Sequence, residues 1–354
     1  MTLDLLIVGG GPVGLATALY AVRAGLEPVV LERGEGALDK ACGEGLMPGG
    51  VTSLRALGVE PEGRALRGIR YIDGRRTAQA EFRQGPGRGV RRTALHRALR
   101  ASVEAAGVQV RRLEACAVDQ GADHVTVRTR TATHGPGPEL VARYAVAADG
   151  LHSPMREMLG LTIASRGPRR WGQRRHYGLP PWSDHVEVHW GPVGEAYVTP
   201  VSDDVVGVAV LSGHRLPFEQ QLAHFPQLAE RLRSGRAVTS VRGAGPLRQR
   251  SSRRVAGRVL LVGDASGYVD SLTGEGISLG VAQGRAAVAA VRAQQPQRYE
   301  WGWRQASWRY SVLTHALVQG TRPGWARRAI VPAAGALPLV FAGAVNELGR
   351  TRER

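Results

Sequence analysis

Lysine is nearly absent from this chain. Of its 47 basic residues, Lys40 is the single lysine and all the others are arginine. The arginines bring the formal net charge to +17, but they are scattered and do not gather with aromatic residues into one stripe. Net charge by itself bears on solubility and non-specific contact. We therefore expect no nucleic-acid partner, and the excess positive charge favours anionic small molecules.

Cysteine is also scarce, and long apolar runs are missing. Two cysteines cannot build a disulfide framework, which predicts a reducing, cytoplasmic location. The first strand follows the initial methionine without a basic segment, so no secretion signal is expected. The seventeen uncharged residues 329–345 are fewer than the ~20 apolar residues that span a bilayer. Proline and glycine interrupt them, which predicts broken C-terminal helices that are buried or make peripheral contact with a membrane.

Several catalytic patterns are missing too. The sequence has no His/Cys cluster with metal-ligand spacing, no motif typical of a Ser-His-Asp catalytic triad and no phosphate-binding lysine loop. A metal centre and hydrolase chemistry are therefore not predicted.

The N-terminal segment has the pattern of a nucleotide-binding βαβ unit. A buried strand at 3–8 leads into Gly9-Gly10-Gly11-Pro12-Val13-Gly14, and an apolar helix and a second strand at 28–31 follow. In G-x-G-x-x-G, the first glycine allows the turn, the second lets the backbone approach a pyrophosphate, and the third lets the helix pack on the strand. Glu32 ends the second strand, where its carboxylate can bind ribose hydroxyls. The unit predicts an adenine dinucleotide, either FAD or NAD.

Two later segments distinguish between these dinucleotides. Asp149-Gly150 follows a strand and opens a helix, and Gly263-Asp264 ends another buried strand. The Asp264 carboxylate at that strand end can accept a hydrogen bond from a ribityl hydroxyl. The next helix begins near Gly274, and its free N–H groups offer positive partial charge to the N1–C2=O edge of a reduced flavin. The dinucleotide is therefore predicted to be FAD.

The periodicity predicts the fold class α/β with an α+β insert: a Rossmann-type FAD-binding domain, an inserted antiparallel substrate sheet and C-terminal helices. The meander is expected from strands at 186–190, 195–199 and 205–211, and one helix is expected near 217–232. The expected boundaries are 1–66, 84–168 and 250–320 for the FAD-binding domain, 67–83 and 169–249 for the substrate sheet, and 321–354 for the C-terminal helical segment.

Three sequence elements are thus in place: the glycine turn at 9–14, Asp149-Gly150, and Gly263-Asp264 with the helix start that follows it. In this order and spacing they resemble the flavoprotein monooxygenase and geranylgeranyl-reductase superfamily, which has the fold of para-hydroxybenzoate hydroxylase. The resemblance covers residues 1–320 and implies NAD(P)H as the reductant. It implies that Arg92, with Arg91 as the alternative, contacts FAD from the start of a helix. The expected cofactor-binding residues are Gly9, Gly11, Pro12, Gly14, Glu32, Arg33, Cys42, Gly43, Arg92, Asp149, Gly150, Gly263, Asp264, Gly274, Gly276 and Ile277.

The amino-acid sequence around Gly263-Asp264 bears on which reaction the protein catalyses. Phenol hydroxylases of the superfamily commonly carry Gly-Asp-Ala-Ala-His, whereas Ser266 and Gly267 stand here in place of the second alanine and the histidine. The segment Thr273-Gly274-Glu275-Gly276-Ile277 is similar to geranylgeranyl-reductase-type proteins. The modest length and the lack of an extended tail favour a monooxygenase of secondary metabolism, using O2 on an aromatic or polyketide-like substrate. A flavin-dependent C=C reductase is the alternative, and a non-catalytic flavin-binding protein would require a substrate sheet without a cavity.

The loop Lys40-Ala41-Cys42-Gly43-Glu44-Gly45 also resembles the reductase branch, where it approaches the flavin and its cysteine bears on activity. Cys42 is the candidate catalytic residue, as a redox or proton-donating thiol. The alternative is a small residue packed against the flavin. Lys40 forms an ion pair with a carboxylate or a phosphate, or is simply solvated.

The aromatic and polar residues of the meander are expected to line a pocket for a hydrophobic or aromatic molecule. Alternation places Glu187 with His189 on one face of the sheet, and Glu195 with Tyr197 and Thr199 on one face. A histidine in such a strand acts as a base or as a hydrogen-bonded structural residue, and both remain open. The candidate substrate residues are His176, Tyr177, His189 and Tyr197.

Overall fold

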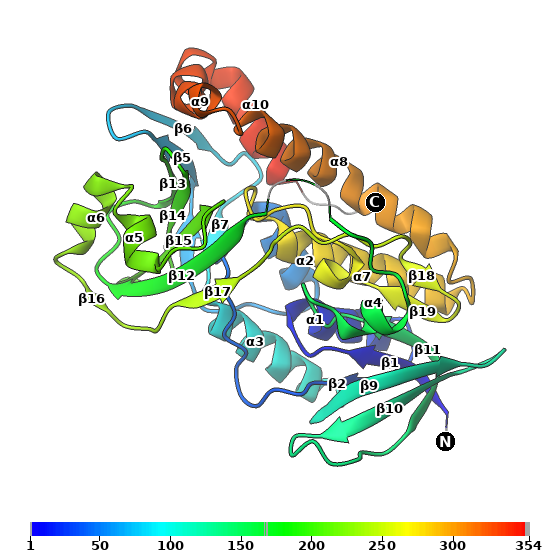
Figure 1. Ribbon diagram of the computed structural model, residues 1–354. Helices are drawn as coiled ribbons and strands as arrows, with labels where there is room; N and C mark the ends of the chain where they lie inside the picture. The colour runs from blue at the N-terminus through cyan, green and yellow to red at the C-terminus, as the bar shows by residue number, and fades with distance from the viewer. Residues whose placement is uncertain (1, 166, 168, 351–354) are drawn as a thin grey trace.

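The computed structural model describes residues 2–165, 167 and 169–350, which form two large sheets, one small sheet and the helices that cover them (Figure 1). Residues 1, 166, 168 and 351–354, which fall within the predicted domain ranges, lie outside the described residues.

The first sheet is built on five parallel strands in the order β19-β11-β1-β2-β8. Antiparallel strands extend it at the β19 and β11 end: β18 pairs with β19, and β10 pairs with the first residues of β11 and with β9. Strand β9 had no clear alternation in the sequence and was not predicted. The strands are β1 (Leu3–Val8), β2 (Pro28–Leu31), β8 (Gln109–Arg111), β9 (Leu113–Gln120), β10 (Val125–Thr131), β11 (Leu140–Ala147), β18 (Val255–Ala256) and β19 (Val259–Leu261).

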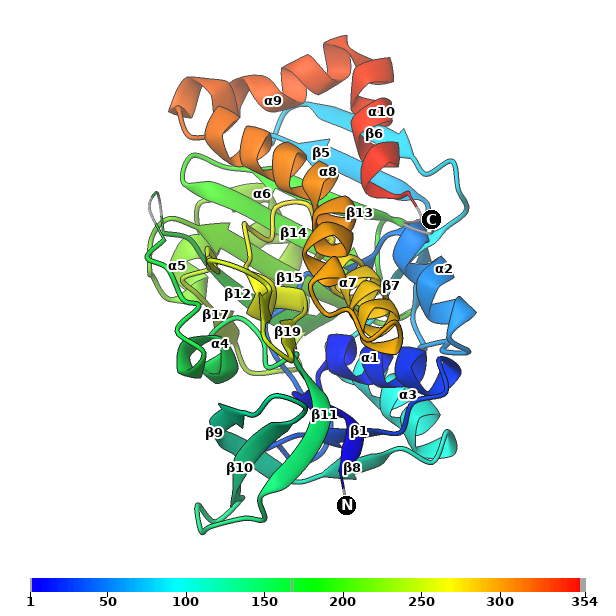
Figure 2. The same cartoon turned by 90° about the vertical axis from the view of Figure 1, so that its right-hand side faces the viewer.

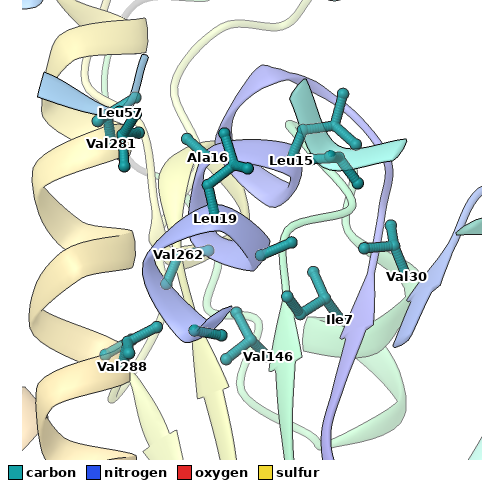
Figure 3. Close-up of a cluster of buried hydrophobic side chains, with 14 of the residues drawn as sticks. Ile7, Leu15, Ala16, Leu19, Val30, Leu57, Val146, Val262, Val281 and Val288 are labelled. Atoms are coloured by element: carbon teal, nitrogen blue, oxygen red, sulfur yellow. The ribbon is translucent and has the colours of Figure 1, made fainter. Parts of the chain in front are cut away.

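Both faces of this sheet are buried, which explains why β1 reads as a continuous apolar run. Leu5 and Ile7 point to one face, and Leu6 and Val8 point to the other. The first face packs against helices α1 (Pro12–Arg23), α3 (Arg92–Ala105) and α7 (Gly276–Arg292). Figure 3 shows Ile7 and Val146 of the sheet facing side chains of α1 and α7.

The second sheet contains the predicted meander, and its main order is β16-β12-β15-β14-β13-β5-β6, with β17 on β12. All of its pairs are antiparallel except one: β5 runs parallel to β13. The α/β fold with an inserted, mainly antiparallel sheet is confirmed. The strands are β5 (Gly68–Ile72), β6 (Thr77–Glu81), β12 (Trp171–Gly178), β13 (His185–Trp190), β14 (Gly194–Pro200), β15 (Val205–Ser212), β16 (Arg236–Ala237) and β17 (Arg242–Ala244).

A small three-stranded sheet is formed by segments that precede and follow β5 and β6 in the sequence. It consists of β3 (Gly45–Leu46), β7 (Gly87–Gly89) and β4 (Arg64–Leu66), with β7 in the middle. Helix α2 (Pro48–Ala56) follows β3 and contacts β7. The loop 40–45 therefore ends in β3, which is held in place by its pairing with β7 and by the helix α2 that follows it.

The single helix predicted near 217–232 is wrong, because the structure has two short helices there. These are α5 (Phe218–Leu222) and α6 (Pro226–Leu232). Pro226 has no N–H to continue a helix from α5, but it is well suited to the first position of α6. Helix α4 (Pro154–Met158) follows the Asp149-Gly150 turn.

Three helices end the described chain: α8 (Arg298–Gly320), α9 (Gly324–Ala336) and α10 (Pro338–Leu348). Helices α9 and α10 confirm the predicted broken pair and meet at a bend of 103°. Figure 2 shows α8 running along the molecule to α9, with α10 returning beside β6. No single described helix is long and apolar enough to cross a membrane, whereas the bent pair passes that test by length and composition only.

Candidate cofactor and substrate site

A cavity of about 820 Å³ lies where strands of the first sheet end. The carboxyl ends of parallel strands are the usual place for a ligand in an open α/β sheet. Fifteen of the sixteen predicted cofactor residues line it, and the exception is Gly14. The fifteen are Gly9, Gly11, Pro12, Glu32, Arg33, Cys42, Gly43, Arg92, Asp149, Gly150, Gly263, Asp264, Gly274, Gly276 and Ile277.

The glycine turn between β1 and α1 is enforced by close backbone contacts. Gly9 has φ +111°, and a Cβ atom there would lie 2.4 Å from the carbonyl oxygen of Ala148. A Cβ at Gly14 would lie 1.8 Å from the Gly9 carbonyl oxygen. Gly14 therefore allows the helix to approach the strand, as its position in the motif predicts, and does not itself line the cavity.

Glu32 is held rigidly at the cavity wall by the backbone. Its Oε2 accepts a hydrogen bond from the Gly10 N–H at 2.8 Å, and its Oε1 accepts one from the Gly34 N–H at 2.7 Å. These two bonds orient the carboxylate and leave lone pairs for a ligand hydroxyl. The neighbouring Arg33 forms an ion pair with Glu114 at 3.0 Å.

The carboxylate of Asp149 accepts hydrogen bonds from the start of helix α4. Its Oδ1 accepts from Ser153 Oγ at 2.5 Å, and its Oδ2 accepts from the Met155 N–H at 2.9 Å. Burial raises the pKa of the Asp149 carboxyl, although these hydrogen bonds oppose the effect. The carboxylate thus acts on the N-terminal turn of α4, and the segment around Gly150 faces the cavity.

Arg156 joins the Asp149-Gly150 segment to the Gly263-Asp264 segment. The sequence alone did not indicate this role. Its buried guanidinium donates to the carbonyl oxygens of Asp264 and Ala265, at 3.3 and 3.0 Å. It also donates to the Leu151 carbonyl oxygen at 3.0 Å. This one side chain therefore fixes the two segments that wall the cavity relative to each other.

Positive side chains face the cavity opposite an acidic group. Burial raises the pKa of the Asp264 carboxyl, and the charges of Arg92, Lys40 and Arg156 oppose that rise. Withdrawal from water and the charge of Arg92 lower the pKa of Lys40. Arg92 lines the cavity and Arg91 is not among its lining residues. The Nε atom of Arg92 is buried without a partner in the described part of the chain, which suits an anionic ligand.

A second cavity, of about 80 Å³, adjoins the first and is called the substrate chamber here. It lies against the inner face of the second sheet, where Val186 and Val188 of β13 and Tyr197 of β14 point inward. Among the described residues that line it, none is a carboxylate or an imidazole. The residues shared by the two cavities are Ala41, Cys42, Gly43, Gly45, Ala244, Leu247, Ser271 and Gly274.

Cys42 therefore lies at the junction of the two cavities. Its Sγ accepts a hydrogen bond from the Glu44 N–H at 3.4 Å. Burial raises the pKa of the Cys42 thiol, and the negative charge of Glu44 adds to that effect, whereas Arg92 opposes it. The neutral thiol is the stable form near neutral pH, so Cys42 has the state of a proton donor and not that of a ready nucleophile.

Glu44 fixes the loop that carries this thiol. It is buried with φ +60°, and its Oε1 accepts from the Arg92 N–H at 2.8 Å. Its Oε2 lies 2.6 Å from Nε2 of His176, and the buried guanidinium of Arg174 lies 3.9 Å from Oε1. Arg174 also pairs with Asp39 at the start of the loop. Glu44 belongs to the predicted flavin-contacting loop 40–45, but nothing in the sequence distinguishes Arg174 from the many other arginines.

Of the four predicted substrate residues, only Tyr197 lines the chamber. His176 is committed to Glu44. Tyr177 packs in a separate cluster with residues of α5 and α6. His189 contacts Glu187 at 3.3 Å, and alternation turns both away because Val186 and Val188 point inward. His176, Tyr177 and His189 therefore lie outside the chamber wall.

Comparison with known proteins identifies the family. Residues 2–212 match the FAD-binding domain family, and the chain belongs to it. Over 333 residues it is 30% identical to a menaquinone reductase from Mycobacterium tuberculosis, covering 83% of this chain and 78% of that protein. It is 28% identical to digeranylgeranylglycerophospholipid reductase 1 from Methanothermobacter thermautotrophicus, covering 81% and 77%.

A solved structure shares the fold. The p-nitrophenol 4-monooxygenase from Pseudomonas putida superposes with a TM-score of 0.79 at 19% identity, covering 98% of both chains. The predicted resemblance to the flavoprotein monooxygenase and geranylgeranyl-reductase superfamily is confirmed, and with it an FAD-dependent oxidoreductase function.

Proposed function

We propose that the chain is a flavin-dependent reductase that saturates a C=C bond in a molecule with a polyisoprenoid chain, with NAD(P)H as the source of electrons. The observation that carries this proposal is the position of Cys42, a half-buried neutral thiol between the cofactor cavity and a mainly apolar chamber.

The cofactor cavity suits FAD in size, shape and charge. The N–H groups of Gly11 and Val13, at the start of α1, would face the pyrophosphate. Glu32 would accept from ribose hydroxyls, and Asp264 from the ribityl chain. The N-terminus of α7, at Gly276, would lie against the flavin ring.

The chamber suits an uncharged alkene. Bound FAD supplies two electrons as a hydride once it is reduced. The Cys42 thiol donates a proton to the other alkene carbon, and the resulting thiolate regains a proton from water. The apolar wall, which includes Leu211, Leu272 and Leu317, positions the polyisoprenoid tail of the substrate and excludes water. Each turnover thus adds one hydride and one proton to the substrate.

The names of the two reductase relatives support this substrate class. Menaquinone and digeranylgeranylglycerophospholipid both carry long polyisoprenoid chains. A polyisoprenoid tail needs apolar contact and no ionic partner. Most of the described residues that line the chamber are apolar, and the charge of Arg174, which also lines it, is paired with Asp39 and Glu44.

Mass spectrometry of the product tests the proposal. Purified protein with FAD, NADPH and a menaquinone or a geranylgeranyl lipid is incubated under argon and in air. Reduction predicts a product two hydrogens heavier in both atmospheres. A product that appears only in air and carries one added oxygen atom would contradict the proposal.

Monooxygenation of an aromatic molecule is the second candidate function. Tyr71 and Tyr197 line the chamber and offer rings on which an aromatic substrate could stack. The fold shared with p-nitrophenol 4-monooxygenase is compatible with this reaction. The mass of the product and its dependence on O2 decide between the two candidates.

A further inference from the structure

The last three helices concentrate the exposed apolar side chains of the molecule. Residues 298–348, which span α8, α9 and α10, are called the C-terminal cap. Of the eight large hydrophobic side chains exposed in the described chain, seven lie on this cap. Trp325 is 75% exposed and Leu339 is 80% exposed. The seven are Trp301, Trp308, Val312, Trp325, Leu337, Leu339 and Val340.

The exposed residues follow the helical period and meet at the bend. On α9, exposed positions at Trp325, Ala329, Ala333 and Ala336 recur every three to four residues. This face continues directly into 337–340, where α9 gives way to α10 and every residue is exposed. The bend is therefore an apolar protrusion at the end of an apolar helix face.

Between Glu300 and Glu347, the charged side chains of the cap are all basic. No aspartate or glutamate occurs from Trp301 to Asn346, and this stretch contains five arginines. Glu347, the first acidic residue after it, pairs with Arg309 at 2.8 Å and with Arg350 at 3.0 Å. The same stretch holds four of the seven tryptophans. Tryptophan with arginine around an apolar surface is the composition that binds the interface of an anionic bilayer.

The cap is also part of the wall of the substrate chamber. Leu317 of α8 and Leu348 of α10 line the chamber. Phe341 of α10 contacts the chamber-lining Tyr71, with ring centroids 4.7 Å apart. Phe341 follows the exposed Val340 directly, so one turn of α10 joins the outer protrusion to the chamber wall.

We infer that the C-terminal cap docks on the surface of an anionic phospholipid bilayer. The protrusion at 337–340 and Trp325 enter the interfacial layer, and exposed arginines such as Arg322 and Arg328 bind lipid phosphates. Docking places the chamber wall next to the hydrocarbon, from which a polyisoprenoid molecule is drawn. This delivery role rests on the proposed function, whereas docking itself does not.

Co-sedimentation with vesicles tests the inference without any substrate. The FAD-loaded protein is mixed with vesicles of phosphatidylcholine alone or of phosphatidylcholine with phosphatidylglycerol. Binding is expected to the anionic vesicles and to weaken with salt. Leu339→Ser combined with Trp325→Ser is expected to weaken binding at least about tenfold. Arg328→Gln is expected to weaken it about fivefold.

Matched controls lie elsewhere on the surface. Val238→Ser changes the one large hydrophobic residue that is exposed outside the cap in the described chain, and Arg233→Gln changes an exposed arginine at the end of α6. Both are expected to bind vesicles as the unchanged protein does. Bound FAD and the melting temperature verify that each variant is folded.

Two results would overturn the inference. One is equal sedimentation of the unchanged protein with and without anionic vesicles. The other is a dimer in solution that Leu339→Ser converts to a monomer, which would assign the surface to a second copy of the chain. Vesicle binding without alkene reduction would instead refute the proposed function and leave the docking surface intact.

Discussion

Cys42 and Glu44 lie two residues apart and contribute differently to the site. Cys42 contacts both cavities, whereas Glu44 holds the loop through His176, Arg174 and the Arg92 N–H. In our account the thiol supplies a proton, and Glu44 is a positioning residue that keeps the thiol at the junction.

Replacing the thiol tests the first role. Cys42→Ala is expected to lower kcat for alkene reduction about a hundredfold, because the proton donor is lost, with little change in FAD affinity. Steady-state kinetics and FAD titration measure both. Cys116→Ala, a change to the other cysteine on β9, is the control and is expected to leave kcat unchanged. Equal rates for the two variants would show that Cys42 only packs.

The pH dependence follows from the raised pKa of Cys42. Burial disfavours the thiolate, so the thiol remains protonated at pH values where an ordinary cysteine, with a pKa of 9.0, begins to ionise. The kcat of the reduction is expected to fall only above about pH 9. A decline centred between pH 7 and 8 would mean that the group titrating is a different one or that the thiol is activated.

Glu44→Gln tests the positioning role. It leaves Arg174 buried near an uncharged amide and is expected to lower the free energy of unfolding by about 3 kcal/mol. Urea denaturation measures the change. Glu219→Gln, in an exposed pair with Arg175, is the control and is expected to change it by less than about 0.5 kcal/mol. A similar small change for Glu44→Gln would contradict its structural role.

At the scale of elements, the sequence predicted what is local and periodic. The βαβ unit, the meander strands and the broken C-terminal helices follow from turn chemistry and hydrophobic period. The break at Pro226 could have been predicted from the same rules, whereas β9 carries no clear pattern and is specified by its pairing with β10.

The site was predictable only in part for the same reason. Motif glycines and acids mark the cofactor cavity because backbone geometry demands them at fixed spacing. The chamber depends on which strand face points inward, and alternation alone does not determine this. Val186 and Val188 line the chamber in the structure, so His189, which follows Val188 on β13, faces away from the chamber. The roles of Arg156 and Arg174 depend on contacts with residues 109 and 135 positions away in the sequence, which no local pattern encodes.

The contact between β1 and α1 gives an element-scale prediction. Gly14→Ala places a methyl group against the Gly9 carbonyl oxygen, which cannot move without opening the turn. Loss of FAD binding is expected in a titration followed by flavin fluorescence. Gly335→Ala is the control, because no atom lies near its added Cβ in α9. Retained FAD affinity in Gly14→Ala would contradict the assignment of the turn.

At the scale of the whole molecule, one cofactor cavity joins segments from both large sheets. Bound FAD is therefore expected to stabilise the entire fold, by about 2.7 kcal/mol at a concentration one hundred times its Kd. Urea denaturation with and without FAD measures this. Cys42→Ala is expected to retain the stabilisation and Gly14→Ala to lose it. An equal response of the two variants would place FAD elsewhere.

The central claim is that the reduced flavin passes its electrons to an alkene in the chamber. The most direct measurement is flavin reoxidation under argon, after reduction with dithionite and rapid mixing with a polyisoprenoid lipid. The account predicts substrate-dependent return of the oxidised flavin spectrum, about a hundredfold slower in Cys42→Ala and unchanged in Cys116→Ala. A flavin that stays reduced until O2 is admitted, and then forms a hydroxylated product, would contradict it.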